Sequence, residues 1–192
     1  MLEFDRALFH AINGAWTNAL FDLIMPIVTN QSNWVPILIM FWLGLFFGAG
    51  GRFRRLAVLL ALVVTLSDQT SSHLIKPICR RMRPCCVETE KRLLIPCSHS
   101  KSFPSSHAAN SAAVAGFVWL ECGTGIGLPA LCLSALISYS RVYVGVHYPL
   151  DVVGGMIIGL VLASAFFFIA RRFWPPRTNQ VKIQPSPERV PL

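Results

Sequence analysis

Long apolar segments limit what this chain can fold into. Residues 34–48 and 152–170 carry no charge, and residues 56–75 and 128–144 are apolar over most of their length. A helix of about 20 residues spans the roughly 30 Å of bilayer hydrocarbon. Charged residues make up 14% of the chain, against about 25% in soluble domains, and 54% of the residues are hydrophobic. The sequence therefore predicts an all-α, polytopic transmembrane helical bundle.

The remaining segments complete this predicted bundle. Apolar residues at helical spacing near the N-terminus predict a short interfacial helix that ends at Asn13-Gly14. Residues 15–28 predict a short tilted helix, and residues 106–120 a helix of small residues, closed by a tight turn at 123–127. About six helices are then embedded in the membrane. We predict one domain over residues 1–174 and a disordered cytoplasmic tail over 175–192.

Basic residues near the spans predict the orientation of the bundle. Arginines follow two spans, at residues 52–55 and 171–172, and such short basic segments are usually cytoplasmic. An even number of predicted spans separates them, so both lie on one side. The long loop 76–105 and the corner 144–149 are then expected on the outer face. That loop is basic despite facing outward, which favours an anion as its ligand.

Three polar clusters fall on this predicted outer face. They are Lys76-Pro77-Ile78-Cys79-Arg80-Arg81-Met82-Arg83-Pro84, Phe103-Pro104-Ser105-Ser106-His107 and Ser140-Arg141-Val142-Tyr143-Val144-Gly145-Val146-His147-Tyr148-Pro149-Leu150-Asp151. Ionisable residues at a membrane edge are costly, so each is a functional-site candidate. Arg141 can hold an oxyanion, His147 can be a nucleophile or an acid and base, and Asp151 can fix its tautomer. Ser105 or Ser106 can cap the next helix, whose N-terminus suits a phosphate.

These clusters resemble the three signatures of the type 2 phosphatidic acid phosphatase (PAP2) superfamily. The matching residues are Lys76-x6-Arg83-Pro84, Pro104-Ser105-Ser106-His107 and Ser140-Arg141-x5-His147-x3-Asp151, with Ser106 where the family commonly has glycine. The resemblance implies that His147 attacks phosphorus to form a phosphohistidine and that Asp151 orients it. His107 would protonate the leaving oxygen and then activate water. The resemblance also implies chemistry without a metal or other cofactor, and phosphate binding by Lys76, Arg83, Ser105, Ser106 and Arg141.

The expected substrate is a lipid phosphate or pyrophosphate whose tail stays in the bilayer, because the chain has little extramembrane mass. Undecaprenyl pyrophosphate is the first choice by resemblance to small bacterial members. Lipid A 1-phosphate, phosphatidylglycerophosphate and phosphatidic acid remain alternatives, as does a lipid-binding or transport protein on the same fold. A vanadium haloperoxidase is disfavoured because those relatives are soluble.

The expected partners are the lipid substrate and the bilayer, with no nucleic acid and no obligatory protein partner. The expected location is the inner membrane, with the site facing the periplasm.

Several other polar residues are predicted to have roles outside catalysis. Arg80, Arg81, Lys91 and Arg92 are interpreted as solvated loop charges or contacts to lipid headgroups. Asp68 and Gln69 are interpreted as hydrogen-bond partners inside a span, with positioning of Lys76 as the alternative. Cys85 or Cys86 can form a disulfide with Cys97 in an oxidising compartment, whereas a zinc site lacks the usual paired spacing.

Overall fold

The computed structural model describes residues 3–48 and 50–176, and within them every regular element is a helix. The helical elements are α1 (Glu3–His10), η1 (Ala11–Ala15), α2 (Ala19–Thr29), α3 (Gln31–Leu43), η2 (Gly44–Gly48), α4 (Gly50–Gln69), η3 (Thr70–Ile75), α5 (Lys76–Cys79), α6 (Pro84–Val87), α7 (Ser106–Cys122), α8 (Thr124–Tyr143) and α9 (Pro149–Phe173). The elements η1, η2 and η3 are π-helical turns. Almost all of the predicted tail lies outside the described residues.

Four helical segments of the described chain are long and apolar enough to cross a bilayer. They are Gln31–Gly48, Gly50–Val87, Thr124–Tyr143 and Pro149–Phe173. The predicted membrane bundle is therefore confirmed. Of the six embedded helices expected, α2 and α7 are shorter than a full span, at 11 and 17 residues.

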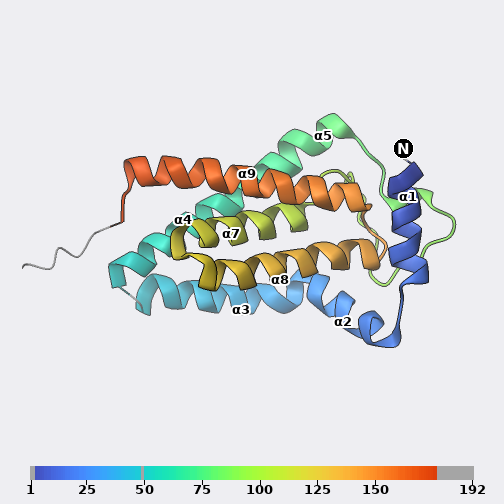
Figure 1. Ribbon diagram of the computed structural model, residues 1–192, viewed down its shortest axis with the longest axis horizontal. Coiled ribbons are helices and arrows are strands. Elements are labelled where there is room, and N and C mark those ends of the chain that lie inside the picture. Colours follow the sequence, from blue (N-terminus) through green and yellow to red (C-terminus); the bar gives the residue numbers. More distant parts are fainter. Residues whose placement is uncertain (1–2, 49, 177–192) are drawn as a thin grey trace, which may run out of the picture.

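Helix α7 forms the centre of the bundle, between α8 and α9 and against α4 (Figure 1). Its small residues make this close packing feasible, because its inward face is a row of fully buried alanines: Ala108, Ala109, Ala112 and Ala113. Helix α9 presents glycines to this row. A Cβ on Gly159 would collide with the carbonyl oxygen of Ala109 and lie 2.9 Å from the backbone nitrogen of Ala113. The two backbones are therefore in direct contact at this crossing.

The Gly159 contact yields a stability prediction. Gly159→Ala should lower the free energy of unfolding by about 1–3 kcal/mol, since the clash with backbone outweighs the roughly 1 kcal/mol gained in helix propensity. Thermal unfolding in detergent, followed by circular dichroism, measures the change. The matched control is Gly125→Ala in α8, where a Cβ would meet no atom within 4 Å. A Gly159→Ala protein as stable as the control would contradict the close packing.

The two basic segments lie at one end of the bundle, as their positions in the sequence predicted. The Arg55 Nε donates to the carbonyl oxygen of Trp174, 2.8 Å away, and its guanidinium forms an ion pair with Glu121. The turn at this end is shorter than predicted. Gly123, with φ +82°, makes the reversal alone, and α8 begins at Thr124.

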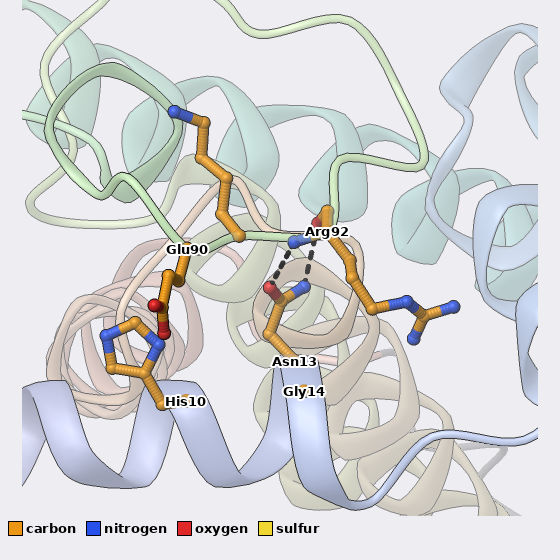
Figure 2. Close-up of a pocket in the computed structure, with 6 residues that line it drawn as sticks. His10, Asn13, Gly14, Glu90 and Arg92 are labelled. Carbon is orange, nitrogen blue, oxygen red and sulfur yellow. Dashed lines mark hydrogen bonds between the residues drawn. The ribbon is translucent and has the colours of Figure 1, made fainter.

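The opposite end of the bundle is covered by α1, which lies across the ends of α8 and α9 (Figure 1). Asn13 does not end this segment as predicted, because η1 continues to Ala15. Its buried side chain instead joins three segments. Its Oδ1 accepts from the Arg92 nitrogen at 2.8 Å, and its Nδ2 donates to the Arg92 and Tyr143 carbonyl oxygens at 2.8 and 2.7 Å. Figure 2 shows Asn13 among the residues that line a pocket, together with His10 and Arg92.

Candidate active site

The three polar clusters of the sequence meet at the end of the bundle that α1 covers. Lys76 begins α5, Arg83 precedes α6, and Ser105 precedes α7. Arg141 lies in the last turn of α8, and Asp151 in the first turn of α9. His147 lies in the tight corner between these last two helices. The ends of five helices thus bring together residues that are up to 75 positions apart in the sequence.

His147 is enclosed at the centre of this group, with 1% of its surface exposed. Its Nε2 lies 2.8 Å from the Nη1 of Arg83. Since a guanidinium can only donate, Nε2 must accept, and the ring proton is on Nδ1. Burial lowers the pKa of the His147 imidazole well below its ordinary value, and neighbouring positive charges, Arg83 foremost, lower it further. The ring is therefore neutral at pH 7, and the electron pair of Nε2 accepts from Arg83.

Asp151 lies beside the protonated nitrogen of His147. The His147 Nδ1 and Asp151 Oδ2 are 3.5 Å apart. Ser102 lies beside both atoms. Its hydroxyl donates to Asp151 Oδ2 at 2.5 Å and is 3.4 Å from His147 Nδ1. Ser102 was not predicted as a site residue, since it precedes the second cluster and carries no motif of its own.

Arg83 is held by the loop that follows α6. Its Nε and Nη2 donate to the carbonyl and hydroxyl oxygens of Ser100, both at 2.8 Å, and its Nη1 also reaches the Val146 carbonyl at 3.1 Å. A disulfide closes this loop, and the structure pairs Cys97 with Cys85 and leaves Cys86 as a thiol. The guanidinium is thereby fixed in place before any ligand binds.

The start of α7 brings Ser105 and Ser106 to the site. The Nζ of Lys76 donates to the Ser106 hydroxyl at 2.6 Å. Ser105 is the N-cap residue by position, but its side chain makes no capping bond, which corrects that part of the prediction. Instead its backbone N–H donates to the Asp151 carbonyl at 2.9 Å, so the starts of α7 and α9 are tied together.

Arg141 and Ser105 each have a buried polar atom that makes no hydrogen bond to the described residues. One Arg141 nitrogen, Nη1, donates to Thr29 at 2.6 Å. Among the described residues, its buried Nε has no partner, and neither does the buried hydroxyl of Ser105. Buried polar atoms without partners are uncommon in folded proteins, and a bound ligand is one explanation for them. His107 follows on α7, where the positive charges of Arg141, Lys76 and Arg83 act on its ring.

Three positive charges gather in this site without a carboxylate in direct contact with any of them in the described residues. Lys76, Arg83 and Arg141 are each buried, with at most 9% of their surface exposed. Within the described part of the chain, none of the three forms an ion pair with a carboxylate. Buried charges are costly unless paired, so the site is built for an anion carrying more than one negative charge.

Two loop arginines differ from their prediction. Arg81 was interpreted as a solvated charge, but its guanidinium is paired with Asp151 at 2.7 Å and also with Asp5 of α1. Arg92 pairs with Asp22 at 2.5 Å. Carboxylates distant in sequence explain both differences. Among the span residues, Asp68 accepts from Asn110 at 3.0 Å, as its structural interpretation predicts.

The sequence matches the PAP2 superfamily over residues 56–175, a range that holds all three clusters. The chain belongs to the PAP2 superfamily. Undecaprenyl-diphosphatase BcrC of Bacillus subtilis is 30% identical over 161 residues, which cover 83% of this chain and 81% of that protein. Lipid A 4'-phosphatase of Bacteroides thetaiotaomicron is 31% identical over 186 residues, which cover 90% and 81%.

The fold agrees with this membership. A transmembrane PAP2-type phosphatidylglycerolphosphate phosphatase from Bacillus subtilis superposes with a TM-score of 0.73 at 23% identity, over 91% of this chain and 88% of that chain. The PAP2 chain described here is accordingly a membrane phosphatase that hydrolyses phosphate esters or anhydrides.

Proposed function

We propose that this phosphatase removes phosphate from the headgroup of a membrane lipid through a phosphohistidine on His147. One observation carries the proposal. Three buried cations without a carboxylate partner in the described residues surround a neutral histidine, and its Nε2 accepts a hydrogen bond from one of them, Arg83. A phosphoryl group held by those cations would place its phosphorus beside Nε2. Phosphoryl transfer depends mainly on such positioning and on neutralised charge.

In the first half-reaction, Nε2 of His147 attacks phosphorus while the bond to the leaving oxygen breaks. The Nδ1 proton stays on the ring, and the positive charge that develops there is stabilised by Asp151. His107 gives its proton to the leaving oxygen, and the bound anion favours the protonated ring before this step because it offsets the nearby cations. Lys76, Arg83 and Arg141 neutralise the phosphoryl oxygens. The free Arg141 Nε and Ser105 hydroxyl supply two further donors.

In the second half-reaction, water attacks the phosphorus of the phosphohistidine. His107, now neutral, takes a proton from this water, and the bond between Nε2 and phosphorus breaks. Inorganic phosphate leaves, and His147 returns to its neutral form. Each proton that His107 donates in the first step is recovered in the second, so the enzyme regains its starting state.

Undecaprenyl pyrophosphate is the proposed substrate, with undecaprenyl phosphate as the product that remains in the bilayer. Three cations suit the several negative charges of a pyrophosphate, and the relative from Bacillus subtilis is named for this reaction. A lipid A phosphate is the second candidate, because the relative from Bacteroides thetaiotaomicron is named lipid A 4'-phosphatase. It matches more of this chain than the relative from Bacillus subtilis does.

We place the protein in the inner membrane with the active site facing the periplasm. The basic segments 52–55 and 171–172 lie at the end of the bundle opposite the site, and such segments are usually cytoplasmic. The disulfide between Cys85 and Cys97 lies on the site's side, and disulfides persist in oxidising compartments. Both features support the same orientation.

Phosphate release from a lipid panel by purified protein in detergent tests this function. Undecaprenyl pyrophosphate, lipid A, phosphatidylglycerophosphate and phosphatidic acid are compared, each with and without EDTA. We expect the highest kcat/KM with undecaprenyl pyrophosphate. We also expect less than a twofold effect of EDTA, because three cationic side chains supply the charge that a metal ion would otherwise bring.

Two results would contradict the proposal in different ways. Turnover that EDTA abolishes and Mg²⁺ restores would exclude the metal-free mechanism. Hydrolysis of lipid A or phosphatidylglycerophosphate alone would retain the mechanism and replace the substrate. Boiled protein and detergent without protein control for contaminating phosphate.

A further inference from the structure

An acidic residue of the N-terminal helix reaches the active site from outside the segment that matches the family. Asp5 lies on α1, whereas the match begins at residue 56. Its side chain is fully buried. We infer that Asp5 is a positioning residue for the phosphatase reaction, acting through Arg81 on Asp151. This inference rests on the proposed function of His147.

Arg81 joins the two carboxylates with separate nitrogens. Its Nη1 donates to Asp151 Oδ1 at 2.7 Å, and its Nη2 donates to Asp5 Oδ2. The guanidinium also stacks over the ring of Tyr148, with 4.4 Å from its central carbon to the ring centroid. A planar group held by two carboxylates and a ring face has one orientation. Arg81 therefore transmits the position of Asp5 to Asp151.

Asp5 also fixes the helix that carries Asp151. Its Oδ1 accepts from the backbone N–H of Leu150 at 2.9 Å, in the first turn of α9. The Oδ2 of Asp151 accepts from the N–H of Tyr148 in the same turn, also at 2.9 Å. Two carboxylates thus satisfy free N–H groups at one helix N-terminus, where negative charge is favoured. Asp5 consequently sets both the rotamer of Asp151 and the backbone beneath it.

The charges of this group indicate why Asp5 matters for catalysis. Asp151 must remain negative to stabilise His147 when that ring becomes positive during attack. Arg81 alone would neutralise Asp151 and draw its carboxylate away from the histidine. Asp5 balances Arg81, so the three residues together keep one net negative charge beside His147. The existing gap of 3.5 Å between His147 and Asp151 leaves little tolerance for further displacement.

A second group of contacts holds helix α1 in place at the end of the bundle. Arg6 forms an ion pair of 2.7 Å with Glu88, and the other oxygen of Glu88 accepts from the Tyr148 hydroxyl at 2.7 Å. Phe9 is fully buried and packs edge-on against the Tyr148 ring. Removal of the Asp5 charge alone should therefore leave α1 docked. This separates a catalytic role from a purely structural one.

The test compares Asp5→Asn with Asp151→Asn and with the double variant, using full-length protein in detergent and the best lipid substrate. We expect Asp5→Asn to lower kcat by about 10- to 100-fold, the range for small misplacements of a catalytic group. We expect KM to change less than threefold, since the three phosphate-binding cations are untouched. In the Asp151→Asn background, Asp5→Asn should have no further effect. Glu3→Gln, an exposed acid on the same helix, is the matched control and should retain wild-type kcat.

Several outcomes would overturn the inference. A wild-type kcat for Asp5→Asn would do so, as would effects of Asp5→Asn and Asp151→Asn that multiply in the double variant. If Asp5→Asn does not fold, the Asp5→Asn/Arg81→Gln pair removes the buried carboxylate together with its partly exposed cationic partner, and Arg81→Gln alone is its reference. The effect of Asp5→Asn is then measured between these two variants, with and without Asp151→Asn. A wild-type protein without phosphatase activity would instead refute the proposed function.

Discussion

Replacing His147 with alanine should reduce phosphate release by about 10⁴-fold or more, the scale seen when a catalytic nucleophile is deleted. The reason is geometric. The Nε2 of His147 points at Arg83, within a group of buried cations, so we expect no other group to take its place at phosphorus. The expected loss lies in kcat. Single-turnover assays with a radiolabelled pyrophosphate headgroup, analysed for lipid product and for labelled protein, measure it.

The controls for this prediction separate chemistry from folding. His73→Ala, at an exposed position of η3, should retain wild-type activity. His147→Ala should unfold at nearly the wild-type temperature and should bind no label covalently, whereas His107→Gln should accumulate label that acid releases, as expected of a phosphohistidine. Turnover by His147→Ala within tenfold of wild type would rule out His147 as the nucleophile.

The spacing of the motif residues and the even number of predicted spans account for much of the candidate site. The cations and histidines of the three clusters sit next to proline, glycine or a helix boundary, and apolar spans between them return the chain to one face. Lys76 and Arg83 could be predicted in this way, because local sequence sets where α4 and η3 end. The central position of α7 follows similarly from its run of alanines.

The contacts that orient these groups could not be predicted in the same way. Ser102, Arg81 and Asp5 make their decisive bonds to residues at least 49 positions away, and no periodic pattern records such pairings. Each is an ordinary polar residue in a loop or an interfacial helix. Their burial results from how α1 and the loop after α6 pack on the bundle end. Supporting contacts of a site depend on tertiary packing, whereas its reacting groups carry local motifs.

Arg141→Gln should have two opposite effects, a large loss of activity and a gain in stability of the free enzyme. Activity should fall by about 10²- to 10³-fold, because one preorganised cationic donor is lost. The stability argument compares two magnitudes. A buried, unpaired charge costs several kcal/mol, whereas the bond from Arg141 to Thr29 contributes about 1.5–3 kcal/mol. The charge penalty is the larger, so the melting temperature should rise by about 2–4 °C for each kcal/mol relieved.

Orthovanadate, which resembles phosphate in shape and charge, completes this test. It should raise the melting temperature of the wild-type protein, since a ligand that binds only the folded state stabilises it by mass action. It should raise that of Arg141→Gln much less. Arg172→Gln, an exposed arginine at the other end of α9, is the matched control and should match wild type in activity and in its response to vanadate. A residue kept for anion binding lowers the stability of the enzyme while the anion is absent. A destabilised Arg141→Gln protein with near-normal turnover would therefore show that Arg141 stabilises the fold and does not bind the phosphate.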